Sequence, residues 1–207
     1  MEIDPDQPDS HREAGSSPSQ QSDKPSVNGA TKGHAHPGAG AFSMYARLLR
    51  RNGYSSLPIE PGGKRPLAAI GDWNRLRVTP LTDEEIDEIV KRHPYAGLGV
   101  AGGYRGLVPI DIDTEEPDIQ AAIDNVLPEY LVGKRGRRGA TVFYRDPKGI
   151  IKPRKFKKAD GSMIMEILTT GQAVIPPTVH PETRRPYQWL TDHTLLQVNI
   201  DELPELY

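Results

Sequence analysis

Two aspartates, Asp111 and Asp113, close the apolar run Leu107-Val108-Pro109-Ile110-Asp111-Ile112-Asp113. In a β-strand successive side chains alternate between two faces, so residues 108, 110 and 112 would enter a core while both carboxylates project from the other face. Carboxylates held this close repel unless a cation neutralises them, and hard ions such as Mg²⁺ or Mn²⁺ prefer oxygen ligands. The spacing therefore predicts half of a divalent-metal site, although a strand that ends in a polar turn has the same pattern.

A third acid, Glu166, interrupts the apolar segment Met163-Ile164-Met165-Glu166-Ile167-Leu168. Burying an unpaired charge in the middle of a strand costs free energy, so Glu166 should lie near a cation, a metal or solvent. On an edge strand it would simply face water. If its strand lies beside that of Asp111 and Asp113, with the carboxylates on one face, the three acids form the ligand set of a two-metal phosphoryl-transfer site.

The stretch from Lys134 to Lys158 contains eleven Lys or Arg residues and a single acid, Asp146, in a chain whose net charge is only −2. Three aromatic residues interrupt it. Cations that displace counterions from phosphates, together with rings for stacking, are what a polyanion-binding surface needs. A solvated basic surface is the simpler alternative. If the stretch does bind nucleic acid, the candidate contacts are Lys134, Arg135, Arg137, Lys152, Arg154, Lys155, Lys157 and Lys158.

The hydrophobic pattern predicts the elements that must position these groups. A helix begins near Phe42, and a capping box of Thr82 with Glu85 starts a second helix that ends near His93. Strands are expected at 97–101, 107–112, 140–145, 163–168, 172–176 and 187–190, separated in the second half by basic loops; residues 102–106 would join the first two strands as a hairpin. A helix from Pro117 would bury Ile119, Ala122, Ile123, Val126 and Leu127. The expected fold class is α/β in the mixed sense (α+β), mostly sheet in its second half.

Only part of the 207-residue chain has the composition of a folded domain. Residues 1–40 contain 16 Pro, Gly or Ser and only three larger apolar residues, so we expect a disordered tail followed by one domain over 41–207. No apolar segment has the length of an export signal or a membrane span, which predicts a cytoplasmic protein without membrane contact. The absence of cysteine excludes disulfides and thiolate metal sites.

Six sequence blocks stand in a particular order and spacing. They are Leu57-Pro58-Ile59; Pro61-Gly62-Gly63-Lys64-Arg65-Pro66 with Trp73; Ala96-Gly97-Leu98-Gly99-Val100; the acids of 110–113; Glu166 with Gly171 to Pro181; and Tyr187-Gln188-Trp189. Together they resemble the bifunctional primase/polymerase (prim-pol) domain of the archaeo-eukaryotic primase superfamily, from about Phe42 to Leu206.

The resemblance implies a prim-pol fold with an RRM-like, largely antiparallel sheet flanked by helices. It also implies a template-directed nucleotidyltransferase, with Asp111, Asp113 and Glu166 as the catalytic ligands of Mg²⁺ or Mn²⁺.

The chain departs from the family pattern at the second motif. The family usually has a small-residue-x-His element there, whose histidine contacts the phosphates of the incoming nucleotide, but here Thr141 stands roughly at that place. Arg138 is the candidate replacement because arginine keeps its charge and donates hydrogen bonds in pairs, with Thr141 as a weaker hydroxyl donor. Further nucleotide or phosphate contacts are expected from Lys64, Thr178 and His180.

Three functions stay open on this basis. The first is an enzyme of DNA replication that synthesises or extends primers from nucleoside triphosphates on a single-stranded DNA template, with a replicative helicase as a possible partner in cis or in trans. The second is a replication-initiation module that keeps the fold and the basic face without turnover. The third keeps the metals and cleaves phosphodiesters. Convergence of the three acids beside an accessible phosphate pocket would favour transfer chemistry.

Overall fold

The computed structural model describes residues 40–206. The predicted disordered tail, 1–40, falls outside these residues except for its last position. The elements follow the chain as α1 (Ala41–Arg51), β1 (Ser56–Ile59), the short 3-10 helices η1 (Ala68–Ile70) and η2 (Trp73–Arg77), α2 (Asp83–Arg92), β2 (Gly97–Ala101), η3 (Tyr104–Gly106), β3 (Leu107–Ile112), α3 (Pro117–Asp124), β4 (Val132–Arg135), β5 (Ala140–Arg145), β6 (Arg154–Lys157), β7 (Met163–Ile167), β8 (Gln172–Val174), β9 (Gln188–Trp189) and η4 (Ile200–Glu202). Within the described part of the chain, no helix has the length and apolar character needed to span a membrane.

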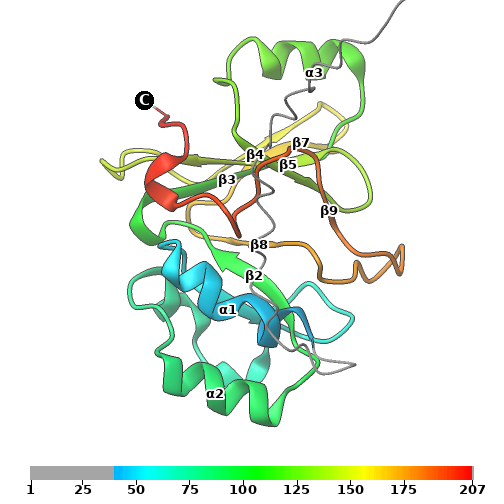
Figure 1. Ribbon diagram of the computed structural model, residues 1–207. Helices are drawn as coiled ribbons and strands as arrows, with labels where there is room; N and C mark the ends of the chain where they lie inside the picture. Colours follow the sequence, from blue (N-terminus) through cyan, green and yellow to red (C-terminus); the bar gives the residue numbers. More distant parts are fainter. Residues whose placement is uncertain (1–39, 207) are drawn as a thin grey trace, which may run out of the picture. The chain divides into compact units, whose positions relative to one another are not determined.

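Two antiparallel sheets organise residues 40–206 (Figure 1). The smaller sheet has the strand order β1-β2-β8, and the larger has the order β6-β7-β3-β5-β4-β9. Helix α1 packs against β1, β2 and α2, whereas α3 lies over the opposite side of the larger sheet. The domain therefore has the predicted mixed α+β class, with antiparallel sheets flanked by helices.

The two faces of the larger sheet contact different apolar clusters. The larger cluster joins α1 and the small sheet to the inner face, where Leu107 and Phe143 are fully buried. The smaller cluster lies on the outer face, where Val108, Ile110 and Ile123 pack together under α3. Polar side chains on the inner face are consequently confined to the part of the sheet that the first cluster does not cover.

The predicted hairpin between residues 97–101 and 107–112 is wrong. β2 pairs with β1 and β8, whereas β3 pairs with β5 and β7. The amide of Gly102 donates to the carbonyl of Gly171 at 2.9 Å, which ties the end of β2 to the segment before β8. Gly103 and Gly106, with φ of 83° and 79°, then turn the chain through η3 into the other sheet. The glycines carry the chain between sheets and do not fold it back on itself.

Helix α3 is shorter than the predicted apolar stripe. It ends at Asp124, so Val126 falls beyond its last turn and is 73% exposed. Ala122 is exposed as well, although Ile123 is buried as expected. Two basic segments form strands that were not predicted: 132–135, for which no element was expected, is β4, and 154–157, expected as a loop, is β6. Both pair with strands that were predicted, so the sheet is wider than the hydrophobic pattern indicates.

Candidate active site

A single row of opposed residues crosses the larger sheet. Asp111 on β3 lies directly opposite Thr141 on β5 and Glu166 on β7. Thr141 in turn lies opposite Lys134 on β4, and Glu166 lies opposite Lys155 on β6. Opposed residues of antiparallel strands project from the same face of a sheet. Acidic and basic side chains from four strands, together with the hydroxyl of Thr141 from a fifth, therefore share one face.

The alternation of β3 fixes which face this is. Val108, Ile110 and Ile112 enter the cluster under α3, as predicted, so Asp111 projects from the other face. Asp113 follows two residues later, and its backbone N–H donates to the carbonyl of Ile164 at 2.8 Å, which continues the pairing with β7 beyond Ile112. A slip of one residue would place both carboxylates among apolar side chains. The buried half of the strand thus holds the acids in position.

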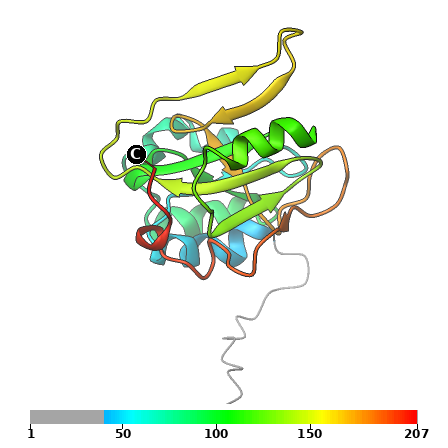
Figure 2. The ribbon, with the colours of Figure 1, turned by 90° about the horizontal axis from the view of Figure 1, so that it is seen from above.

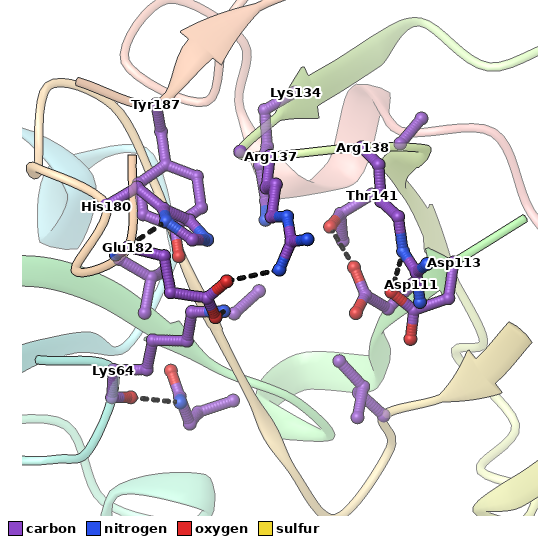
Figure 3. A pocket seen from close by; sticks show the side chains of 16 residues that line it. Lys64, Asp111, Asp113, Lys134, Arg137, Arg138, Thr141, His180, Glu182 and Tyr187 are labelled. Atoms are coloured by element: carbon purple, nitrogen blue, oxygen red, sulfur yellow. Dashed lines mark hydrogen bonds and ion pairs between the residues drawn. The ribbon is translucent and has the colours of Figure 1, made fainter. Parts of the chain in front are cut away.

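A pocket of about 380 Å³ opens on this face, between the larger sheet and β8 (Figure 3). Its walls come from the loop after β1, from β3, from β4 and the turn into β5, and from the segment after β8. The predicted site residues that line it are Lys64, Asp111, Asp113, Lys134, Arg137, Arg138, Thr141 and His180. Segments widely separated in the sequence therefore meet in one polar cavity.

Each of the three predicted metal ligands has a different partner. Asp111 accepts a short hydrogen bond from the hydroxyl of Thr141, and a carboxylate oxygen of Asp113 lies 4.0 Å from Nε of Arg138. Glu166 forms an ion pair with Nζ of Lys155 at 3.2 Å and does not line the pocket. Within residues 40–206, no three His, Asp or Glu side chains are grouped closely enough to hold a metal ion. The structure places two of the three acids in the pocket and the third beside them in the strand register.

The donor chemistry of Asp111 and Asp113 suits a hard divalent cation. Burial and the charge of Asp111 raise the pKa of Asp113, so the two carboxylates are close enough to repel each other. Both supply oxygen, the ligand type that Mg²⁺ prefers. A divalent cation bound to the pair would remove the repulsion.

Cations form the remaining wall of the pocket. Arg137 and Arg138 come from the turn between β4 and β5, and Lys64 from the loop after β1. Lys134 is only 6% exposed, and burial lowers its pKa to about 8. Its Nζ lies 4.7 Å from the centre of the Tyr187 ring, a favourable position for a cation. The wall suits a polyanion placed next to the two aspartates.

His180 contributes one free ring nitrogen to this pocket. Its Nδ1 accepts hydrogen bonds from the backbone N–H groups of Glu182 and Thr183, at 3.2 and 3.3 Å. A nitrogen that accepts carries no proton, so the neutral ring has its proton on Nε2. Burial, and then the charge of Lys64, lower the pKa of His180 and favour this neutral form. The ring can therefore donate one hydrogen bond from Nε2.

Among the lining residues that the sequence did not single out, Glu182 and Tyr187 have side chains that contact predicted site residues. Glu182 forms ion pairs with Arg137 and, at 3.7 Å, with Lys64, so it joins two loops across the cavity (Figure 3). The ring of Tyr187 lies 5.1 Å from that of His180 and packs between it and Lys134. Tyr187 belongs to a sequence block noted above but has no chemical signature. Glu182 has no signal at all, because only the folded loops bring it to the cations.

Several predicted contacts lie outside the pocket. The hydroxyl of Thr178 accepts from the amide of Leu98 at 2.7 Å and donates to its carbonyl at 3.1 Å, so Thr178 ties the segment after β8 to β2. Arg135 donates from Nε to the carbonyl of Gly139 at 2.9 Å. The predicted nucleic-acid contacts beyond residue 150 lie on and around β6, at the sheet edge seen in Figure 2: Lys152, Arg154, Lys155, Lys157 and Lys158.

Comparison with known proteins identifies a family whose model covers most of the described residues. No curated protein sequence matches the chain. The family model described as "Bifunctional DNA primase/polymerase, N-terminal" matches residues 46–206, which include every lining residue of the pocket. A function of the primase/polymerase type, carried out by a nucleotidyltransferase-type enzyme on DNA and nucleotides, follows from that match. The chain belongs to the Prim-Pol family.

Proposed function

We propose that this protein is a template-directed nucleotidyltransferase of DNA replication. It would synthesise or extend primers from nucleoside triphosphates on single-stranded DNA. The observation that carries the proposal is the pocket in which Asp111 and Asp113 face Lys64, Arg137 and Arg138. Carboxylates opposite a cationic wall suit a reaction in which a metal-bound triphosphate is attacked and pyrophosphate leaves.

The cations would bind the triphosphate. Arg137 and Arg138 can each donate in pairs to phosphate oxygens, and Lys64 adds a compact charge from a separate loop. Because Glu182 pairs with both Arg137 and Lys64, an incoming triphosphate would compete with this carboxylate for them. A ligand with more negative charge would displace Glu182 from these cations more readily. The competition would therefore favour a highly charged ligand such as a triphosphate.

Asp111 and Asp113 would hold Mg²⁺ or Mn²⁺, with Glu166 contributing from the neighbouring strand. Such ions lower the pKa of an attacking hydroxyl and stabilise charge on the leaving pyrophosphate. Thr141 orients Asp111 through its hydroxyl, so its place on β5 gives it a positioning role. His180 would donate from Nε2 to a phosphate oxygen, which together with Arg138 supplies donors where the family's second-motif histidine is absent.

The basic edge of the sheet would contact the template. Arg154 and Lys157 are exposed on β6, and the guanidinium of Arg154 lies 4.8 Å from the centre of the Phe156 ring. Cations beside an aromatic ring suit a single strand, whose phosphates and bases are both accessible.

Primer extension and de novo priming with labelled nucleotides and Mn²⁺ or Mg²⁺ test this function. The double variant Asp111→Asn/Asp113→Asn should reduce incorporation by roughly a hundredfold or more, because it removes the charge that would hold the ions. The matched control is Asp118→Asn/Asp124→Asn, which makes the same charge change on exposed positions of α3. Equal incorporation by wild type and the 111/113 variant would refute the catalytic assignment.

A second candidate is a binding module of the same fold without turnover. The observation in its favour is Thr141, which stands where the family usually has histidine. Such a module would bind single-stranded DNA in a gel-shift assay yet incorporate no nucleotide with either metal. Incorporation that depends on Asp111 and Asp113 would exclude it.

A further inference from the structure

A second cavity, of about 220 Å³, lies across the β7–β8 turn from the active-site pocket. Leu168 lines the first cavity, whereas the next two residues, Thr169 and Thr170, line the second. The other walls of the second cavity come from η2, from Gly103 and Gly106 at the two ends of η3, from the start of β3 and from the loop 146–153. The two cavities thus adjoin but share no lining residue.

Two buried polar atoms beside this cavity lack a hydrogen-bond partner in the described part of the chain. They are Nε of Arg77 and Oγ1 of Thr169. Arg77 makes one long hydrogen bond, from Nη2 to the carbonyl of Thr169 at 3.5 Å, and forms no ion pair with a carboxylate of residues 40–206. Unsatisfied buried donors are costly and uncommon, and both atoms belong to residues that line this cavity. A ligand that accepts hydrogen bonds would offset their cost once a small rotation of each side chain exposes them.

The charge of the cavity favours an anion. Arg77 and Lys152 line it from two different segments. The acid that lines it, Asp146, has both carboxylate oxygens occupied, because they accept backbone N–H groups at 3.1, 2.9 and 2.6 Å from Lys148, Gly149 and Ile151. Those three peptide dipoles offset the charge of Asp146, which leaves the two cations to set the sign of the site.

We propose that this cavity binds a phosphate group, held by Arg77, Lys152 and the hydroxyl of Thr169. Guanidinium, ammonium and hydroxyl donors are the usual partners of phosphate oxygens. Leu107 and Val108, which line the cavity, precede Asp111 on the same strand by roughly 10 to 13 Å at the usual rise per residue. The phosphate is therefore either free in solution or part of a nucleic-acid strand that also reaches the active site.

Amide NMR of the full chain in EDTA tests the proposal without nucleotidyl transfer. Inorganic phosphate should produce saturable shifts at the lining glycines Gly103, Gly106 and Gly149 and at Thr169. An unphosphorylated oligothymidylate distinguishes the source: if the same amides move at lower concentration than with inorganic phosphate, the site takes a backbone phosphate. If only inorganic phosphate moves them, the site takes the free ion. If neither ligand moves them, the proposal is wrong.

Variants separate binding from folding. Arg77→Met should weaken phosphate binding by about tenfold or more, the loss expected for a charge-assisted hydrogen bond. Arg75→Met is the matched control, since Arg75 also lies on η2 but pairs with Glu85 at 2.7 Å and lines a different cavity. Should Arg77→Met fail to fold, Thr169→Val provides a second test, because it removes an unpartnered hydroxyl at nearly constant volume.

Thr169→Val should leave the unfolding midpoint of the free protein unchanged or higher, and should weaken phosphate binding. Unchanged affinity in the Thr169 and Lys152→Met variants would overturn the assignment. All binding is measured in EDTA, where no metal-dependent nucleotidyl transfer occurs. A negative binding result would therefore contradict the phosphate site alone, and absence of polymerase activity would leave the phosphate site standing.

Discussion

For Lys134, burial favours the neutral amine, whereas the proposed binding of phosphate needs the charged ammonium. The side chain is almost fully buried, which lowers its pKa to about 8, yet it lines the pocket beside Asp111 and Asp113. The Tyr187 ring offsets part of the desolvation by accepting the ammonium on its face. Lys134 is therefore the pocket cation whose charge should respond to a small rise in pH.

Triphosphate binding should weaken as the pH rises through about 8, because Lys134 loses its proton there. The sign follows from the charged form being the one that attracts phosphate, and this form predominates below the pKa. We expect the dissociation constant for tripolyphosphate in EDTA, measured by calorimetry, to rise by roughly tenfold between about pH 7 and about pH 9.

The control for this titration is Lys134→Met, which has no charge at either pH. It should bind weakly at about pH 7 and approach wild type at about pH 9. If both proteins show the same pH dependence, another group controls binding and Lys134 has no part in it.

His180 shows what sequence can and cannot predict for one residue. A histidine flanked by prolines is often only a loop residue, so the family resemblance alone indicated a nucleotide contact. The side chain does line the pocket. Its tautomer depends on two backbone N–H groups that reach Nδ1 only because the chain turns back at 182–183. Spacing along the sequence carries no information on such a turn. Glu182 was not predicted for the same reason. The cations with which it pairs, Arg137 and Lys64, lie in loops about 45 and 118 residues earlier in the sequence.

Among the elements, the loop 146–153 contains one buried carboxylate that accepts several backbone hydrogen bonds. Asp146 is 3% exposed and accepts three backbone N–H groups of its own loop. The carbonyl of Gly106 also accepts the amide of Asp146 at 2.7 Å, which joins the loop to η3. Residues 146–153 form no helix or strand, so hydrogen bonds of this kind contribute strongly to the shape of the loop.

Asp146→Asn should lower the free energy of unfolding by about 2 kcal/mol, since one carboxylate oxygen becomes an amide that cannot accept. Urea denaturation followed by far-UV circular dichroism measures the change. The comparison is Asp160→Asn, an exposed loop aspartate that accepts from the backbone N–H and hydroxyl of Ser162. Its unfolding midpoint should stay near that of wild type. Equal midpoints for the two variants would show that the buried loop does not need the charge of Asp146.

Local sequence patterns correctly predicted the start of α2 and the buried face of β3. The capping box of Thr82 and Glu85 is present with both hydrogen bonds, and the apolar alternation of β3 holds. Strand β6 was missed because it is a basic edge strand whose side chains are mostly exposed, so it has no apolar periodicity. Its partner choice, like the division between two sheets, depends on contacts distant in sequence. Short-range spacing favoured a hairpin at Gly102, and the long-range bond to Gly171 overrode it.

At the scale of the whole molecule, the net charge is only −2, but the charges are unevenly distributed over the described residues. Acids and cations meet in the active-site pocket, whereas the edge strand β6 presents Arg154 and Lys157 to solvent. Lys155 on the same strand forms an ion pair with Glu166, which lies opposite it on β7. This pair connects the basic edge to the row of opposed residues that contains Asp111. Net charge therefore says little about affinity for DNA, and the position of the cations says more.

Replacing Arg154 and Lys157, two of the three exposed cations of β6, should reduce the salt dependence of DNA binding. Each cation that neutralises a phosphate of a single strand adds about 0.7 to the slope of log K against log salt. We expect Arg154→Gln/Lys157→Gln to lower the magnitude of that slope by about 1.4 when both residues contact phosphates. Fluorescence anisotropy with a labelled oligothymidylate, at several salt concentrations in EDTA, measures it.

The charge-matched control is Arg51→Gln/Lys91→Gln, which removes two exposed cations from the ends of α1 and α2 on the side of the small sheet. Helices α1 and α2 lie on the side of the small sheet, away from β7, the strand that pairs with β6 (Figure 1). The slope should therefore keep its wild-type value. An equal loss in both double variants would mean that DNA responds to total charge alone. An unchanged slope in the β6 variant would place the template on another surface, because phosphates bound at β6 must release counterions there.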